Sequence, residues 1–478
     1  MFSLAAQATT ATGTAVLTLY LVRALGPNGY GTFVLAVAVS SLALIAADMG
    51  LANSAARYIA ERRSQRAAVR EVFGDALRLK LVLSTLVAGV LVLAAGPIAS
   101  LYGTPGLVWP LRAAAVALIG QSVMGLIGGA FNALRRVSLN LRMVVGESVV
   151  ETTASIVLVA AGAGATGAAL GRAIGYVVAG IGGLLLLART VGRPRLRASS
   201  ISRNLIGYAA ALVMIDASVM LFNQVDVFVI GAYLDTAAVG AFEAPMRLTS
   251  VFAYPGLALA AAVAPQFARG AEPTSGGAAL VSATRLLLIG HAAVAAIVLV
   301  WAGPIVAILL GNGYADSTSV LRALTPFVLL AGIAPLLSLS VNYLGHARKR
   351  LPIAVGTVLA NLVIDVIFVP RIGIVAGAIG TDVAYIGYVG GHLWLCRREA
   401  DVSLRPLAGS ALRCGLAAAV MAGSLVLWGT ESVPVAILAL GGVCGIAIYG
   451  LVLLATREVT GVEIVDLYRG LGLSRRSP

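Results

Sequence analysis

Four polar residues in the second half of the chain have side chains suited to binding a hard cation: Asp226, Asn361, Asp365 and Thr381. Hard cations prefer oxygen ligands, and this set supplies two carboxylates, an amide and a hydroxyl. Asn361 and Asp365 are four residues apart, so they share a face if the segment is helical. The set predicts a sodium or proton site. The alternative is that these groups only hydrogen-bond neighbouring helices to one another.

A second group of charged residues could bind a substrate or pair internally. Glu243 and Arg247 are four residues apart, as are Glu147 and Glu151, and Arg172 follows in the next apolar segment. A charge within an apolar segment usually faces protein or a water-filled cavity. We expect Arg172 to pair with Glu151 or Glu147. For Arg247 two interpretations remain open, which are contact with an anionic substrate and neutralisation by Glu243.

The elements that must position these residues are membrane-spanning helices. Hydrophobic residues make up 59% of the 478 residues and charged residues only 11%, whereas a soluble domain is about a quarter charged. Apolar runs that approach about 20 residues are long enough to cross a bilayer. The sequence predicts fourteen spans, at residues 2–22, 31–53, 81–102, 108–133, 138–160, 166–188, 205–231, 237–264, 281–310, 317–344, 351–370, 373–396, 408–430 and 434–456.

The basic residues indicate how these spans are oriented. The 34 Lys and Arg residues give a net charge of +14, and most of them lie in alternate loops. By the positive-inside rule those loops and both termini are cytoplasmic, in a multi-pass protein of the cell (inner or plasma) membrane. The charge therefore reports topology, and we expect no nucleic-acid partner. Neither lysine, Lys80 or Lys349, follows a glycine, which excludes a GxxxxGK[ST] phosphate-binding loop for ATP.

The sequence repeats itself weakly along most of its length. Residues 95–103 read AGPIASLYG and residues 302–311 read AGPIVAILLG, and other matches keep an offset that drifts only from 207 to 210. These matches include Gly31 with Gly240, Asn132 with Asn342, and Gly167 with Gly377. A self-match at one period is typical of a duplicated transporter, and six spans per copy make the two copies parallel.

This duplication predicts an all-α polytopic membrane protein with two six-helix lobes. Residues 1–190 would form the first lobe (spans 1–6) and residues 203–398 the second (spans 7–12). Two further spans within residues 405–456 lie outside the duplication, and a cytoplasmic tail follows at residues 457–478.

Five motifs resemble a known family. They are RALGPNGYGTF at residues 23–33, ADMGL at 47–51, RYIAE at 57–61, NQVD at 223–226 and VGAF at 239–242. Together they resemble the polysaccharide-transporter family of lipid-linked oligosaccharide flippases, in the multidrug/oligosaccharidyl-lipid/polysaccharide exporter superfamily. The resemblance implies two lobes around a cavity. It also implies that the chain flips an undecaprenyl-diphosphate-linked oligosaccharide outward by alternating access, for cell-surface or extracellular polysaccharide synthesis.

The resemblance also implies roles for particular residues. Arg23, Arg57 and Arg247 match arginines that meet the diphosphate in the related lipid II flippases, and Glu243 stands beside Arg247. The cation set named above matches the sodium set of those relatives. We therefore expect no cofactor other than sodium or a proton as coupling ion. The expected partners are the lipid-linked glycan, the bilayer, and a polysaccharide polymerase and glycosyltransferases.

Two alternatives belong to other functional classes. A cation-coupled multidrug antiporter of the same superfamily would favour an acidic, aromatic-lined cavity, and only 6% of this chain is aromatic. A membrane glycosyltransferase or glycan polymerase needs catalytic groups on sizeable outer loops, and the predicted outer loops are short. We expect a transporter and not an enzyme.

Overall fold

The chain is helical throughout the part that its computed structural model describes, which is residues 2–194, 217, 220–267, 273–344, 347–400, 402–431 and 433–459. These residues pack into two compact units. Unit 1 comprises residues 1–248 and 354–380, and unit 2 comprises residues 249–353 and 381–478. No strand occurs among the described residues, which confirms the all-α prediction.

Unit 1 contains the first part of the chain together with one later helix. Its helices are α1 (Phe2–Asp48), α2 (Leu51–Glu61), α3 (Arg66–Leu101), α4 (Val108–Ala133), α5 (Val137–Leu158), α6 (Gly164–Val191), α8 (Val225–Tyr233), α9 (Thr236–Ser250), most of α15 (Leu351–Ile372) and the first turns of α16 (Val375–Ala400). Helices α2, α3, α4 and α6 enclose a hydrophobic core that includes Ile59, Phe73, Ile127 and Phe131.

In two cases, a pair of consecutive predicted spans forms one continuous helical segment that bends at glycine. Gly26 has φ 64° inside α1 and is followed by Pro27, so α1 consists of two arms that correspond to spans 1 and 2. Gly162 and Gly164, with φ 87° and 55°, join α5 to α6 in the same way for spans 5 and 6. These positive φ angles are accessible to glycine at little cost, whereas a side chain would strain the bend.

Two repeat-related segments pack directly on each other in unit 1. A Cβ atom added to Gly31 would collide with the carbonyl oxygen of Thr236, and one added to Gly240 would collide with that of Pro27. The Thr236 hydroxyl also donates to Oδ1 of Asn28. Positions 27 and 31 are each 209 residues before 236 and 240, so the contact is reciprocal. Reciprocal contacts arise where a two-fold axis passes between equivalent segments, which supports the duplication.

Alanine at Gly240 is expected to destabilise the protein by about 1–3 kcal/mol, because the added methyl group overpacks a backbone-to-backbone contact. Gly89→Ala is the matched control, since Gly89 lies in α3 with open space around its Cβ position. Thermal unfolding of the detergent-solubilised protein should show a lower midpoint for Gly240→Ala and an unchanged or higher one for Gly89→Ala. Equal midpoints would contradict the close contact.

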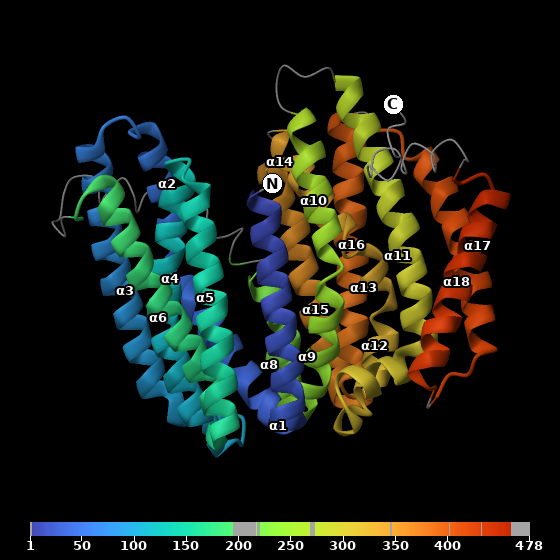
Figure 1. Cartoon of the computed structure of the whole chain (residues 1–478), viewed down its shortest axis with the longest axis horizontal. Helices are drawn as coiled ribbons and strands as arrows, with labels where there is room; N and C mark the ends of the chain where they lie inside the picture. Colours follow the sequence, from blue (N-terminus) through green and yellow to red (C-terminus); the bar gives the residue numbers. More distant parts are fainter. Residues whose placement is uncertain are drawn as a thin grey trace, which may run out of the picture. The chain divides into compact units, whose positions relative to one another are not determined.

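Unit 2 contains the remaining helices. They are α10 (Ala253–Val263), α11 (Pro273–Leu309), α12 (Ser317–Ala323), α13 (Thr325–Leu330), α14 (Ile333–Tyr343), α17 (Arg405–Val426), α18 (Val435–Ala455) and most of α16. Their shared core includes Trp301, Leu337, Cys414, Met421 and Leu425. Among the described residues, α11 packs along α17 and α17 along α18 (Figure 1).

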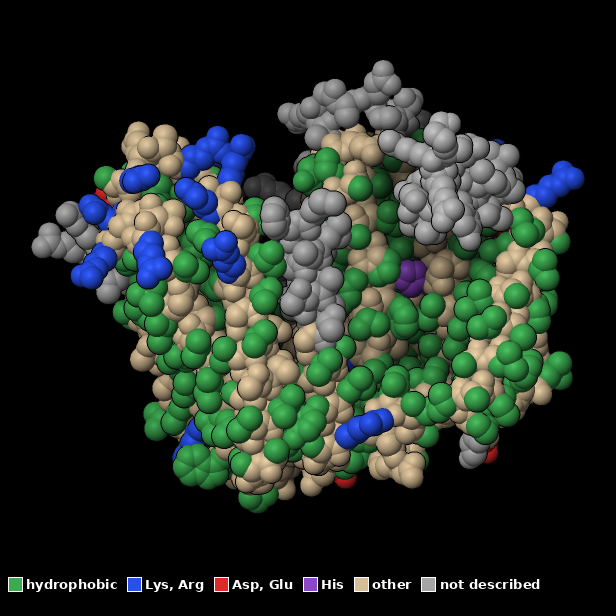
Figure 2. All heavy atoms as spheres, viewed as in Figure 1, with side chains coloured by type: hydrophobic (Ala, Val, Ile, Leu, Met, Phe, Trp, Pro, Cys, Tyr) green, Lys and Arg blue, Asp and Glu red, His purple; other side chains and the backbone are tan. Residues whose placement is uncertain are grey.

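The predicted spans are found as helices of suitable length and composition. Nine helical stretches among the described residues are long and apolar enough to cross a membrane, and two of them are the joined pairs above. Shorter apolar helices at Met220–Tyr233 and Ile333–Tyr343 match spans 7 and 10, and α16 matches span 12. In Figure 2, Lys and Arg side chains gather over one end of unit 1 and hydrophobic side chains cover the middle of its helices. The chain is a multi-pass membrane protein.

Some predictions fall outside these observations. The first part of span 7, at residues 205–216, and the tail beyond residue 459 lie outside the described residues. The lobe boundaries 1–190 and 203–398 stay predictions, as do the separate roles of residues 405–456 and 457–478.

Candidate functional site

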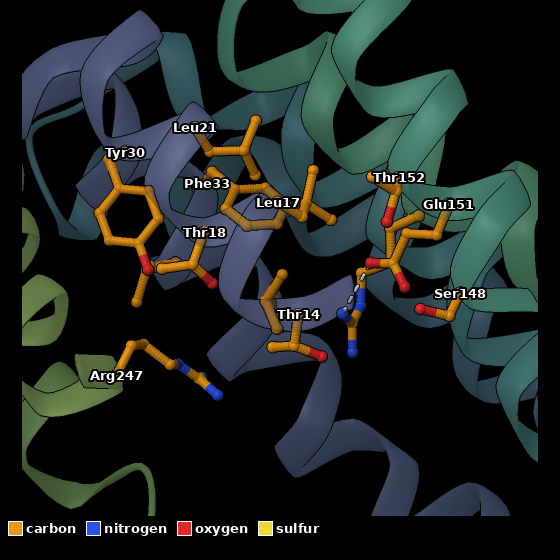
Figure 3. Close-up of a pocket in the computed structure, with 13 residues that line it drawn as sticks. Thr14, Leu17, Thr18, Leu21, Tyr30, Phe33, Ser148, Glu151, Thr152 and Arg247 are labelled. Carbon is orange, nitrogen blue, oxygen red and sulfur yellow. Dashed lines mark hydrogen bonds and ion pairs between the residues drawn. The ribbon is translucent and has the colours of Figure 1, made fainter. Parts of the chain in front are cut away.

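A polar pocket of about 110 Å³ opens in unit 1 between α1, α5, α6 and α9 (Figure 3). It is lined by Thr14, Leu17, Thr18, Leu21, Tyr30, Phe33, Val34, Val37, Ser148, Glu151, Thr152, Arg172 and Arg247. The bend at Gly26 places both arms of α1 in its wall. Charged and hydroxyl groups from helices far apart in the sequence therefore meet around one space.

Arg247 enters this pocket from α9 and is held by an acidic neighbour. Its Nε lies 2.7 Å from Oε1 of Glu243, one turn earlier in the same helix. The Glu243 side chain is buried, whereas 43% of the Arg247 side chain is exposed. Figure 3 shows the guanidinium group pointing from α9 into the space beside Thr14. Glu243 therefore neutralises and orients a guanidinium group that still faces the pocket. Contact of Arg247 with an anionic substrate stays a prediction.

Arg172 faces the same pocket from α6. Its NH1 donates to Oε1 of Glu151 at 3.1 Å and its NH2 donates to the Tyr176 hydroxyl at 3.0 Å. The predicted pair with Glu151 is confirmed. The sequence interpretation nevertheless missed that this pair lines a pocket together with Arg247, since the pairing alone suggested an internal structural contact.

Hydroxyl groups form the rest of the polar lining, and the sequence analysis did not identify them. Thr14 and Thr18 are one turn apart on α1, and Ser148 and Thr152 are one turn apart on α5. Tyr30 lies across from Arg247 (Figure 3). Guanidinium groups bind phosphate oxygens in fork geometry, and hydroxyl groups donate to or accept from sugar and phosphate oxygens. The pocket is therefore suited to an anionic, hydroxyl-bearing ligand.

The other two arginines predicted to bind substrate lie elsewhere. Arg57 is exposed on α2 and pairs with Glu61, with Nε 3.1 Å from Oε1. Arg23 is exposed on the first arm of α1. Neither belongs to the lining of this pocket. Their contact with substrate stays a prediction.

Three of the four residues of the predicted cation site lie together in unit 1. Nδ2 of Asn361 donates to Oδ1 of Asp226 at 2.9 Å and lies 3.3 Å from Oδ2 of Asp365. Asp226 comes from α8, and the other two come from α15. All three side chains are buried. Residues 135 positions apart in the sequence thus form one polar cluster.

Two oxygen atoms of this cluster retain their capacity to accept. Oδ1 of Asn361 and Oδ1 of Asp365 are buried and have no hydrogen-bond partner among the described residues. Both lie against Gly380 of α16, where a Cβ atom would be 3.3 Å from the Asn361 oxygen and would collide with the Asp365 oxygen. Buried acceptors are normally satisfied, so two of them facing one glycine fit a sodium ion or a proton.

Thr381 is fully buried and follows Gly380 directly in α16. It belongs to unit 2, and the approach of its hydroxyl group to the cluster stays a prediction. No group of three or more His, Cys, Asp or Glu side chains that could hold a metal ion occurs in the part of the chain that the structure describes. Carboxylate, amide and hydroxyl oxygens suit a hard cation better than a soft transition metal.

Several known proteins with similar sequences or folds are named as transporters or flippases. A flippase of Haloferax volcanii, described as a probable low-salt glycan biosynthesis flippase (Agl15), is 24% identical over 370 residues, which cover 77% of this chain and 76% of that protein. The lipid II flippase MurJ in an inward closed conformation has a TM-score of 0.78 at 14% identity, covering 98% of this chain and 99% of that one.

An inward-facing multidrug resistance transporter of the MATE family has a TM-score of 0.64 at 20% identity, covering 82% of this chain and 95% of that one. At these identities the structural matches show a shared fold. The sequence itself matches the family described as "Polysaccharide biosynthesis protein" over residues 1–271, more than half of its length. The chain belongs to the polysaccharide biosynthesis protein family.

Proposed function

We propose that this chain flips an undecaprenyl-diphosphate-linked oligosaccharide across the cell membrane for synthesis of a surface or extracellular polysaccharide. The observation that carries the proposal is the pocket of unit 1, in which Arg247 and Arg172 meet a row of hydroxyl groups. The family and the glycan flippase of Haloferax volcanii support this class of substrate. The proposed orientation places both termini in the cytoplasm, in agreement with the distribution of Lys and Arg.

The chemistry of the pocket fits the two parts of such a substrate. The diphosphate carries the strong negative charge, and Arg247 presents a guanidinium group already oriented by Glu243. The sugars carry many hydroxyl groups, which match Thr14, Thr18 and Ser148. Because Arg247 and Arg172 each have a carboxylate neighbour, the pocket carries little net charge. A pocket with little net charge would bind the anionic substrate only weakly. Weak binding allows the substrate to be released on the other side of the membrane.

The proposal is tested by reconstituting the full chain in vesicles that contain a lipid-linked oligosaccharide. We expect the glycan to reach the opposite leaflet at a rate above that of protein-free vesicles, measured by its accessibility to an enzyme that cannot cross the membrane. Efflux of cationic drugs without movement of the lipid would favour the multidrug antiporter, the second candidate. A multidrug transporter of the MATE family shares this fold, so drug efflux is measured in the same vesicles.

We further propose that sodium or a proton couples transport through Asp226, Asn361, Asp365 and Thr381. The acceptor oxygens that face Gly380 support this role. The repeat supplies a second argument, because Asn361 lies 210 positions after Glu151. Glu151 is bonded to Arg172. In the first half, the guanidinium group of Arg172 therefore lies beside Glu151. We propose that a free cation takes the corresponding position beside Asn361 in the second half.

Partner enzymes follow from the same proposal. Glycosyltransferases must supply the lipid-linked oligosaccharide on one side of the membrane, and a polymerase or ligase must consume it on the other. The chain itself is proposed to act as a transporter without catalysing a chemical reaction.

A further inference from the structure

A second charged cavity lies in unit 2, between the N-terminal parts of α11 and α17. Its volume is about 470 Å³. It is lined by Val281, Ser282, Arg285, Arg405, Pro406, Gly409, Ser410, Arg413 and Glu458. Three arginines thus surround a single carboxylate. Both helices begin at this end, which the distribution of Lys and Arg assigns to the cytoplasmic face.

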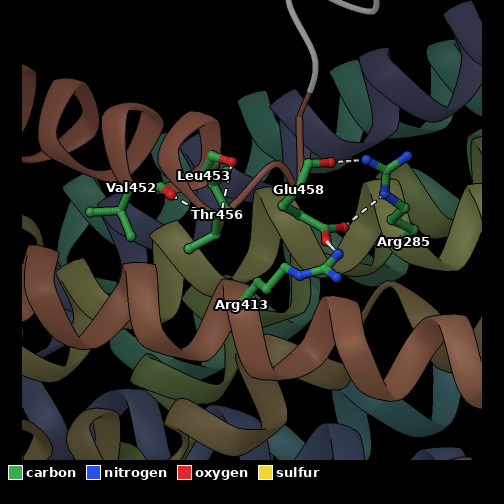
Figure 4. A network of polar contacts seen from close by, with 6 residues as sticks. All are labelled: Arg285, Arg413, Val452, Leu453, Thr456 and Glu458. Atoms are coloured by element: carbon green, nitrogen blue, oxygen red, sulfur yellow. Dashed lines mark hydrogen bonds and ion pairs between the residues drawn. The ribbon is translucent and has the colours of Figure 1, made fainter.

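The carboxylate is built into the protein and fixes two of the arginines. Nε of Arg285 donates to Oε1 of Glu458 at 2.7 Å, and NH1 of Arg413 donates to Oε2 at 2.8 Å (Figure 4). Arg285 also donates through NH2 to the backbone oxygen of Glu458. The Glu458 side chain is 1% exposed, and it connects the end of α18 to α11 and α17.

Glu458 is ionised in this arrangement. Burial raises the pKa of its carboxyl group, but hydrogen bonds from Ser410, Arg285 and Arg413 outweigh that effect and lower the pKa below its usual value. One negative charge therefore faces three guanidinium groups, since Arg405 also lines the cavity and is exposed. The cavity carries an excess of positive charge, which favours an anion.

An apolar groove lies further along the same two helices, where Leu288 follows Arg285 by three residues and Cys414 follows Arg413 directly. It has a volume of about 300 Å³. Its lining is almost entirely apolar: Leu288, Ala292, Ala295, Ala296, Leu299, Thr325, Leu329, Ala411, Cys414, Gly415, Ala418, Ala419 and Ala422. The small residues of α17 leave the groove open between α17 and the helices α11 and α13. The cationic cavity and the apolar groove thus follow one another along α11 and α17.

The length of the groove matches one leaflet of a bilayer. From Ala411 to Ala422 the helix rises about 16 Å at 1.5 Å per residue. The hydrocarbon core of a bilayer is about 30 Å thick, so a single leaflet accounts for about half of it. An acyl chain that starts at the cavity would therefore fill the groove and end near the middle of the membrane.

We propose that this cavity and groove bind a resident anionic phospholipid, with its phosphate at Arg405 and Arg413 and one acyl chain along α17. Charge complementarity selects an anionic headgroup, and the groove selects a lipid over a free phosphate ion. The site is distinct from the pocket of unit 1. Glu458 holds Arg285 and Arg413 in place. A fixed arrangement of this kind suits a lipid that stays bound rather than one that is moved across the membrane.

The test is native mass spectrometry of the full chain in detergent, titrated with phosphatidylglycerol and with phosphatidylcholine of the same acyl chains. We expect phosphatidylglycerol to bind more tightly. Arg405→Gln should weaken its binding about tenfold, the loss expected for a charged hydrogen bond. Arg405 makes no contact with Glu458 in the network above, so this variant should fold. Arg398→Gln, which removes another exposed charge, from α16, should leave binding unchanged.

The groove is tested separately. Ala419→Phe fills the groove and should also weaken binding of phosphatidylglycerol, whereas Leu412→Phe, at a lipid-facing position outside the groove, should not. Equal affinity for the two phospholipids, or an unchanged affinity in Arg405→Gln, would overturn the proposal. So would displacement of the lipid by millimolar inorganic phosphate. Loss of undecaprenyl diphosphate binding alone in Arg405→Gln would assign the site to the substrate and would also overturn it.

Discussion

Arg247→Ala is expected to abolish flipping of the lipid-linked oligosaccharide in reconstituted vesicles while the protein still folds and inserts. Truncation of a charged group that binds an oppositely charged partner typically costs about 2–5 kcal/mol, and each 1.4 kcal/mol is about tenfold in affinity. The rate of flipping should therefore fall by about 30-fold or more. Arg247→Lys keeps the charge but loses the fork geometry, so an intermediate rate is expected.

One control separates the lost substrate contact from damage to the site. Removing Arg247 leaves Glu243 buried without the partner that lies 2.7 Å away, and an unpaired buried carboxylate is itself destabilising. The double variant Arg247→Ala/Glu243→Gln removes that charge. If the double variant regains flipping, the arginine serves only to neutralise Glu243. If it stays inactive with a normal unfolding midpoint, Arg247 contacts the substrate.

The side-chain pairs that the sequence predicted are four residues apart in a helix. That spacing places both members of a pair on one face of the helix. Asn361 and Asp365 are four residues apart in an apolar helix, so they had to share a face. Glu243 and Arg247 pair for the same reason. The contact of Asn361 with Asp226 joins residues 135 positions apart, and spacing does not give it. The fold was predictable because apolar segments of membrane length, basic loops and a repeat all indicate the same architecture.

The parts that were missed depend on contacts between distant segments. Thr14, Thr18, Ser148 and Thr152 look ordinary, because hydroxyl residues are common in packed membrane helices. They form a pocket only where the first arm of α1 packs against α5. Similarly, Glu458 lies 173 residues from Arg285, and nothing in its local sequence indicates that pairing.

Asp365→Asn is expected to remove most of the dependence of transport on sodium or on pH. A cation can shift the balance between inward and outward states only if it binds one of them more tightly. Asp226 and Asp365 bring two carboxyl groups to one buried cluster through Asn361, and a cation between them would relieve the repulsion of the two ionised groups. Asparagine has the same shape as aspartate, and its oxygen can still accept from Nδ2 of Asn361. The substitution therefore removes charge with little change in packing.

Flipping by reconstituted vesicles should be measured across sodium concentrations and across pH for three variants. Asp365→Asn should lower the stimulation by the coupling ion at least about tenfold, as expected for the loss of one charged ligand, with substrate binding retained. Gly380→Ala should act similarly without a change in charge, because its methyl group would occupy the space beside Oδ1 of Asp365. Asp316→Asn is the matched control at an exposed position. If Asp365→Asn and Gly380→Ala both keep the wild-type response to sodium and to pH, the cluster only joins α8 to α15, and the energy for transport enters elsewhere.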